Sequence, residues 1–121
     1  MDEKTSVHEL KEDVKKFCEE REWDSYHNAK DLAIGVITEA SELLEHFRFK
    51  TEKQSDDKMR AKDREAVADE VADVLYFVLR IAQRFDIDLT TELRRKIKKN
   101  AEKYPAEKYK GRRFDNHPSV R

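Results

Sequence analysis

The sequence predicts an all-α protein, and three observations support this expectation. The 121 residues include only two Gly and two Pro, which leaves few of the turn residues that sandwiches, barrels and Rossmann-type folds need. Charged residues make up 44% of the chain, yet the formal net charge is -1, which favours salt-bridged helices over a self-repelling coil. Apolar residues also recur at three- and four-residue spacing, as on one face of a helix.

Four helices are predicted from this periodicity, and most have recognisable ends. Ser6 and Glu9 form a plausible capping box at the start of the first helix. Asn28 and Asp88 are candidate N-caps of the second and fourth helices, and Pro105 is a stop signal for the fourth. The four helices are expected at about 6–22, 29–49, 63–85 and 89–104.

The rest of the chain is polar. Residues 50–62 are interpreted as a mobile loop or an extra polar turn. One domain is expected over residues 1–105, followed by a basic C-terminal tail at 106–121 that is disordered or partly ordered. Because the apolar share of 37% is thin for a small helical core, burial against another copy of the chain is expected.

Several classes of protein are excluded by the composition. The longest apolar run, 74–79, has six residues, whereas a membrane span needs ~20. The N-terminal stretch has no apolar core, so no secretory signal peptide is expected. The single Cys18 allows no internal disulfide or cysteine metal site and suits a reducing cytoplasm. The balanced charge provides no general attraction to nucleic acid. We expect a cytoplasmic protein with neither a membrane nor a nucleic-acid partner.

Four acidic residues lie at unusual positions on two of the predicted helices. Glu39 and Glu42 on the second helix, and Glu70 and Asp73 on the third, are each spaced i, i+3, so each pair shares a helix face. At ~100° per residue, Glu70 falls inside the apolar arc of its helix, and the solvent face is expected to pass through Arg80. Packing of the two apolar stripes should therefore bring four carboxylates together.

Converging carboxylates indicate a cation, because buried like charges repel and an unpaired buried carboxylate is costly. Oxygen ligands suit Mg²⁺ or Mn²⁺. The alternative is that the acids pair with Lys or Arg across the helix interface. Zinc, di-iron and phosphate-loop motifs are absent from the sequence. His46, one turn beyond Glu42, is either a neighbour of the site or an ordinary helix-face histidine.

These residues resemble those of the all-α nucleoside triphosphate pyrophosphohydrolases, the MazG-like and dCTP-pyrophosphatase-like families. Their pattern is Glu-Glu-x-x-Glu followed by Glu-x-x-Asp on the next helix. This chain reads TEASE at 38–42 and EVAD at 70–73, and Thr38 replaces the first Glu as in the dCTP-pyrophosphatase branch. The resemblance extends from about Leu10 to Pro105 and includes Trp23, the turn at 86–89 and the stretch from Lys96 to Pro105.

The resemblance implies a four-helix bundle-like, MazG-type fold that forms a homodimer or homotetramer. It also implies hydrolysis of a nucleoside triphosphate to the monophosphate and pyrophosphate, a reaction suited to nucleotide-pool sanitation. By the same resemblance, Mg²⁺, with Mn²⁺ as the alternative ion, is held by the catalytic carboxylates Glu39, Glu42, Glu70 and Asp73.

The resemblance further implies two groups of substrate-binding residues. Phe49 and Phe77 stand where a tryptophan and a tyrosine are usual, and Val14 where a histidine is usual, so the nucleobase pocket is expected to discriminate weakly. Trp23 and Phe49 could instead be core or subunit contacts. The implied base-binding residues are Trp23, Phe49 and Phe77, and the implied phosphate-binding residues are Lys30, Lys96, Asn100 and Tyr104.

A second class of function stays open at this point. A catalytically inactive helical protein of the same fold could serve in interaction or regulation. Retention of all four acids favours the enzyme, because an inactive relative has little reason to keep Glu70 inside an apolar arc.

Overall fold

A computed structural model describes residues 1–111, and the remainder of the predicted tail, 112–121, lies outside the described residues. The described part is helical throughout and contains no strand, which confirms the predicted fold class. None of its helices has the length and apolar character needed to cross a lipid bilayer. The helices are α1 (Val7–Glu20), the 3-10 turn η1 (Asp24–Tyr26), α2 (Ala29–Glu45), α3 (Glu52–Lys58), α4 (Arg64–Arg84), α5 (Leu89–Lys103) and α6 (Ala106–Tyr109).

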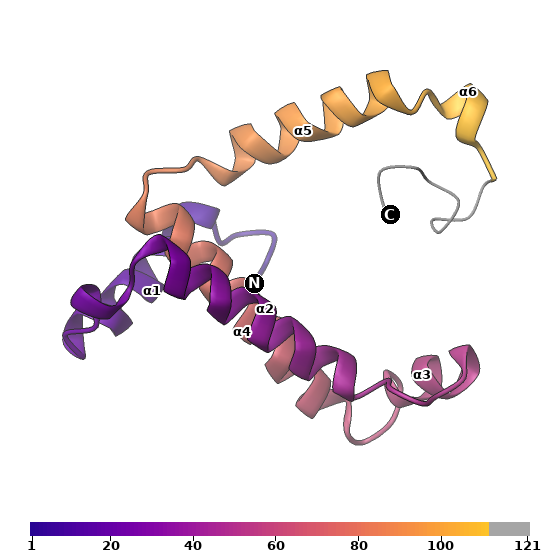
Figure 1. The fold of residues 1–121 in the computed structure, drawn as a ribbon, viewed down its shortest axis with the longest axis horizontal. Coiled ribbons are helices and arrows are strands. Elements are labelled where there is room, and N and C mark those ends of the chain that lie inside the picture. The colour runs from indigo at the N-terminus through magenta and orange to yellow at the C-terminus, as the bar shows by residue number, and fades with distance from the viewer. Residues whose placement is uncertain (112–121) are drawn as a thin grey trace. The chain divides into compact units, whose positions relative to one another are not determined.

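Helix α4 is the central element of the first compact unit, Met1–Ile87. It packs against both α2 and α1, and Figure 1 shows α2 lying alongside it. Because two helices contact α4, its buried surface is wider than one apolar arc. The buried apolar side chains of the described residues reflect this arrangement and come from all three helices: Cys18, Leu32, Val67, Leu79 and Ala82.

The predicted helix starts are confirmed by their capping bonds. The Ser6 hydroxyl accepts from the backbone N–H of Glu9 at 3.1 Å, and the Glu9 carboxylate accepts from the Ser6 N–H at 3.1 Å. Asn28 and Asp88 cap α2 and α5 in the same way through their side-chain oxygens. Helix α2 ends at Glu45, earlier than the predicted limit at 49.

The polar stretch at 50–62 contains a short helix, α3, so the expectation of an extra polar turn is the better of the two interpretations. A capping box begins it: Thr51 accepts from the Gln54 N–H at 3.1 Å, and Gln54 accepts from the Thr51 N–H at 2.9 Å. None of its residues is buried. Local capping therefore stabilises α3 where apolar packing does not.

Helices α5 and α6 belong to a second compact unit that begins at Asp88. Helix α5 ends at Lys103, close to the predicted stop, and Pro105 then forms the N-cap of α6. Helix α6 occupies the first residues of the stretch expected as a basic tail.

Candidate active site

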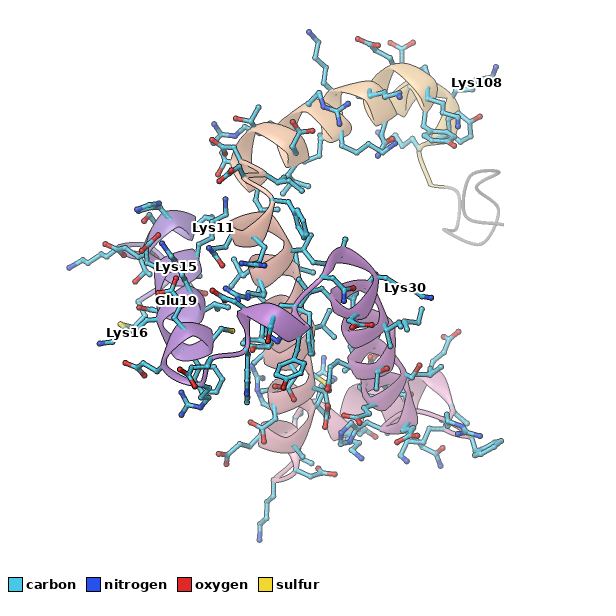
Figure 2. All side chains as sticks on the ribbon, turned by 60° about the vertical axis from the view of Figure 1, so that its left-hand side comes forward. Lys11, Lys15, Lys16, Glu19, Lys30 and Lys108 are labelled. Atoms are coloured by element: carbon cyan, nitrogen blue, oxygen red, sulfur yellow. The ribbon has the colours of Figure 1, made fainter. Side chains whose placement is uncertain are left out.

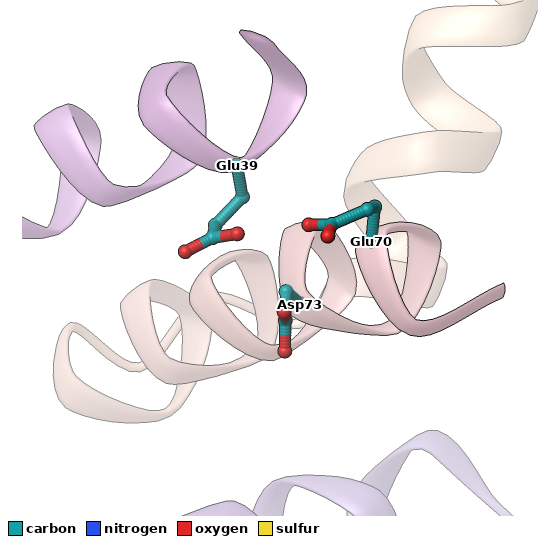
Figure 3. A group of neighbouring side chains, drawn as sticks. All are labelled: Glu39, Glu70 and Asp73. Atoms are coloured by element: carbon teal, nitrogen blue, oxygen red, sulfur yellow. The ribbon is translucent and has the colours of Figure 1, made fainter. Parts of the chain in front are cut away.

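Carboxylates from α2 and α4 meet in the first unit. Glu39, Glu70 and Asp73 each offer an oxygen, and these oxygens all lie within 4.8 Å of one another. Figure 3 shows the Glu39 side chain on α2 and the Glu70 side chain on α4 turned towards each other, with Asp73 further along α4. Glu42, one turn after Glu39, adjoins both glutamates closely enough to perturb their titration. We call these four residues the carboxylate cluster.

The carboxylate cluster concentrates like charges at one place, which is compatible with a divalent cation. Hydrogen bonding to Glu42, together with burial and repulsion from the other acids, raises the pKa of Glu39 to about 7. Burial, followed by hydrogen bonding to Glu42 and repulsion, raises the pKa of Glu70. One carboxylate oxygen of Glu39 and one of Glu70 are buried without a hydrogen-bond partner.

The alternative of charge pairing across the helix interface is not what the structure shows. Within residues 1–111, none of the four acids forms an ion pair with a Lys or Arg. His46 partly offsets the raised pKa of Glu70, so it does neighbour the cluster. Buried oxygens that lack a partner and repel one another fit a hard divalent ion.

A cavity of about 550 Å³ opens beside the cluster, and we call it the aromatic cavity. Its rings contact one another edge to face, with centroids 5.6 Å apart for Phe17 and Trp23 and 5.0 Å apart for Tyr76 and Phe77. Such rings offer flat apolar faces on which a planar group can stack. The lining combines two acids of the cluster with residues of α1, the turn after it and α4: Asp13, Val14, Phe17, Trp23, Glu39, Ala72, Asp73, Tyr76 and Phe77.

Tyr76 is a functional candidate that the sequence analysis missed. It precedes Phe77 on α4 and, like Phe77, lines the aromatic cavity. The Tyr76 hydroxyl lies 3.1 Å from the buried Cys18 thiol, within hydrogen-bond distance. Burial, with the Cys18 contact, raises the pKa of Tyr76, so the hydroxyl stays protonated. The available signal was its position one turn after Asp73 on α4.

Gly35 on α2 allows Phe77 to occupy its place in this cavity. A Cβ atom at position 35 would lie 2.4 Å from the Phe77 ring, which is closer than real side chains approach. The ring therefore packs directly against the α2 backbone.

A second cavity, of about 310 Å³, is lined by the other two acids of the cluster, Glu42 and Glu70. We call it the polar cavity. Lys58 of α3 is the lysine in its lining. The Lys58 side chain is only 18% exposed, and its Nζ lies 3.6 Å from Oδ2 of Asp63. Sequence analysis missed Lys58 because it read this polar stretch as a loop or an extra polar turn and assigned no site residue to it. The lining is formed by Glu42, Glu45, His46, Lys58 and Glu70.

The structure leaves untested the roles of several other residues that were predicted to bind substrate. Phe49 lines neither of the two cavities; it is 95% exposed and adopts a left-handed backbone conformation with φ 62°. Lys30 is exposed at the start of α2 and points outwards (Figure 2). Lys96 and Asn100 are exposed on α5 and Tyr104 is its C-cap, all in the unit that begins at Asp88. The roles of these residues stay predictions.

Arg80 corrects the expected solvent face of α4, because its side chain is only 1% exposed. Its Nε donates to His27 Nδ1 at 2.9 Å and its Nη2 donates to the Asp24 carboxylate. The turn η1 and the residues around it therefore cover Arg80. A helical wheel of α4 alone could not reveal this, because the covering residues lie far away in sequence.

Comparison with known proteins agrees with this geometry. The sequence model of the MazG-like family matches residues 34–114. The chain is 31% identical over 91 residues to human dCTP pyrophosphatase 1 and 29% identical over 96 residues to the rat protein. These matches cover 74% and 78% of this chain but only 54% and 56% of the relatives, so the chain spans about half the length of the curated relatives it matches.

A solved structure is also similar. A pyrophosphatase from Archaeoglobus fulgidus superposes with a TM-score of 0.77 and 31% identity, over 82% of this chain and 92% of that one. The family match covers most of the sequence, including all four acids of the carboxylate cluster. The resemblance inferred from the acidic motifs is thereby confirmed: this chain belongs to the MazG-like family.

Proposed function

We propose that this protein is a divalent-cation-dependent nucleotide pyrophosphohydrolase that converts a nucleoside triphosphate to the monophosphate and pyrophosphate, in the service of nucleotide-pool sanitation. The observation that carries the proposal is the carboxylate cluster, with its unpartnered buried oxygens, beside an aromatic cavity large enough for a nucleobase. The dCTP pyrophosphatases and the archaeal pyrophosphatase support the reaction class.

The residues present fit a hard divalent cation, Mg²⁺ with Mn²⁺ as the alternative. Glu39, Glu70 and Asp73 would hold it, with Glu42 beside them. When bound, the cation would neutralise polyphosphate charge and supply Lewis acidity. A carboxylate of the cluster that is not occupied by the cation can accept a proton from the attacking water.

The two cavities suggest in which orientation the nucleotide binds. The base would stack on Trp23 and Phe77 in the aromatic cavity. The β- and γ-phosphates would extend towards Lys58 and His46 in the polar cavity on the other side of the cluster. Lys30, Phe49, Lys96, Asn100 and Tyr104 remain proposed substrate contacts from the family pattern alone.

Self-association is part of the proposal, as a homodimer or homotetramer. On α2, Ile34, Ile37 and Leu44 share one face and are 49%, 66% and 60% exposed. On α4, Val71 and Leu75 are 50% and 46% exposed. Apolar faces of this kind are typically buried against another protein surface.

A screen of nucleoside triphosphates with Mg²⁺ or Mn²⁺, detecting pyrophosphate and monophosphate together, tests the function. We expect both products in equal amounts and no inorganic phosphate. The complete absence of turnover, together with a melting temperature that does not change with the cation, would instead favour the interaction or regulatory protein.

The same screen tests base selectivity. We expect the accepted triphosphates to differ in kcat/KM by no more than roughly tenfold, because stacking on aromatic faces tolerates every base. Asp13 and Tyr76 are residues with polar side chains that line the cavity and that the sequence prediction left out. A preference above ~10³ for one base would indicate that these residues form hydrogen bonds to the base. Asp13→Asn and Tyr76→Phe would then reduce that preference.

A further inference from the structure

The turn that carries Trp23 has little apolar attachment to the rest of the protein. Trp23 is the N-cap of η1, and it follows Glu22, which takes a left-handed conformation with φ 55°. No residue of η1 is buried, and Tyr26 is 69% exposed. Trp23 itself is joined to the end of α1, because its N–H donates to the Cys18 carbonyl at 3.1 Å and its ring contacts Phe17. Polar interactions must hold the rest of the turn against α4.

Two arginines of α4 make that attachment. Arg80 donates to the Asp24 carboxylate through Nη2 and to His27 Nδ1 through Nε at 2.9 Å. It therefore binds η1 at its first residue and at the residue that follows its last. Arg84 adds a bond from Nη2 to the Asp24 carbonyl oxygen at 3.3 Å and an ion pair of 3.8 Å to its carboxylate.

Burial makes the attachment by Arg80 strong. The Arg80 side chain is 1% exposed, whereas the Asp24 side chain is 47% exposed. If the turn moved away, the guanidinium would lose its bonds to Asp24 and His27 and would keep only its bond to Gln83 Oε1. Hydrogen bonds between a guanidinium and a carboxylate are among the stronger ones in proteins, and exclusion of water strengthens them, so the state with the turn attached is preferred.

Asp24, which the arginines bind, is the direct neighbour of a residue that lines the aromatic cavity, Trp23. Asp24 follows Trp23 directly, and the Tyr26 N–H donates to the Trp23 carbonyl at 2.9 Å, which links Trp23 to η1. The Trp23 ring is part of the cavity wall, edge to face with Phe17. Arg80 lies two turns after Asp73 on the same helix, so α4 carries both the acids and the group that fixes the wall.

We propose that Arg80 and Asp24 are positioning residues that fix Trp23 in the wall of the aromatic cavity and thereby determine how tightly the nucleobase binds. The nucleotide part of this inference rests on the proposed function; the placement of Trp23 does not. Neither residue lines the aromatic or the polar cavity, so both act through the turn without touching the substrate.

Fluorescence tests the placement directly, because Trp23 is the sole tryptophan of the chain. In Arg80→Met and Asp24→Asn we expect a red-shifted emission and stronger quenching by acrylamide, with unchanged helical circular dichroism. The matched control is Arg95→Met, which removes an exposed ion pair of 2.8 Å to Glu92 on α5 and should change neither signal. Because Asp24 is half-exposed, Asp24→Asn keeps the test valid should Arg80→Met fail to fold. Unchanged Trp23 emission in folded Asp24→Asn would overturn the proposal.

Kinetics test the consequence for the substrate. We expect Asp24→Asn to raise the KM of a nucleoside triphosphate about tenfold while kcat stays within about twofold, since the lost effect is stacking and not chemistry. In a double-mutant cycle, Trp23→Ala with Asp24→Asn should have the KM of Trp23→Ala alone. Additive effects would overturn the proposal. A wild-type protein without turnover would refute the proposed function, whereas the fluorescence result would still decide the placement.

Discussion

Glu70 and Asp69 are neighbours on α4 with different surroundings. Glu70 belongs to the carboxylate cluster and has a buried unpartnered oxygen, whereas Asp69 is exposed. We expect Glu70→Gln to abolish cation-dependent turnover while the cation-free protein keeps its melting temperature or gains a few degrees, because one repelling charge is lost. Pyrophosphate release and thermal melting measure the two effects.

Asp69→Asn is the matched control and should change neither turnover nor melting. If Glu70→Gln kept full activity, or unfolded the protein, Glu70 would not be a cation ligand.

Single residues differ in how far the sequence could predict them. Glu70 was predictable, because its place inside the apolar arc of α4 depends only on residues of the same helix. Arg80 was not, because the residues that cover it, Asp24 and His27, come from a turn 56 and 53 residues earlier. The requirement for glycine at position 35 was not predictable either, because it arises from the Phe77 ring of another helix. Burial by distant segments is a property of packing and leaves no local pattern.

At the scale of elements, the facing acids of α2 and α4 predict a pH dependence. The pKa of Glu39 is raised from 4.5 to about 7, and that of Glu70 is also raised. Between these values the folded state binds more protons than the unfolded state, so the free energy of unfolding of cation-free protein should fall as the pH rises from 4.5 towards 7. Denaturant unfolding at several pH values measures this slope.

Glu39→Gln is the control for this slope, because it removes the group with the pKa of about 7 and should flatten the dependence. The control is needed because His27 acts in the opposite direction. Burial and the neighbouring Arg80 lower the pKa of His27, so its contribution to stability is lost as the pH falls below 6.5. An unchanged slope in Glu39→Gln would contradict the prediction. Saturating Mg²⁺ should abolish the fall in wild-type stability with rising pH, because the cation keeps the carboxylates deprotonated.

Helix α3 makes a prediction about phosphate binding. The Lys58 side chain is 18% exposed in the polar cavity, whereas that of Lys53 on the same helix is 86% exposed. A hydrogen bond to a charged group contributes about 1.5–3 kcal/mol, so Lys58→Met should raise the KM of the triphosphate by roughly ten- to a hundredfold. Lys53→Met should leave KM unchanged. Equal KM values for the two variants would exclude Lys58 from phosphate binding.

Elements with an apolar stripe were predictable as helices with definite starts, whereas the stretch without one was predicted only as a loop or an extra polar turn. The helices now called α1, α2, α4 and α5 were predicted from periodicity and caps, and their observed starts agree closely. Helix α3 has no buried residue and therefore no stripe. Its Thr51 and Gln54 capping box was the available signal, and it would have brought Lys58 into the account of the site.

At the scale of the whole molecule, the exposed apolar faces of α2 and α4 predict an assembly. We expect sedimentation to show a dimer or tetramer at micromolar concentration, and Ile37→Glu to shift it towards monomer by burying a charge in the interface. Lys53→Glu on α3 introduces the same carboxylate at an exposed site and should not change the assembly. A wild type that is fully folded and monomeric would contradict this prediction.

The fold class was predictable from composition, whereas the assembly could only be inferred from it. Few Gly and Pro and mixed charges indicated helices, and the described residues confirm them. The apolar share of the composition does not say which apolar residues are buried within one chain and which stay exposed to a partner. Leu32 is 1% exposed and Ile37 is 66% exposed on the same helix, and only the packed structure separates the two.

The contact between Gly35 and Phe77 has an evolutionary consequence. Because a Cβ at position 35 and the ring at position 77 compete for one volume, the two positions should change together among relatives. A relative with alanine at position 35 should carry a smaller side chain at position 77, and the wall of its aromatic cavity should be displaced accordingly. The shape of the pocket is thus inherited as a pair of residues, one of which contributes only by having no side chain.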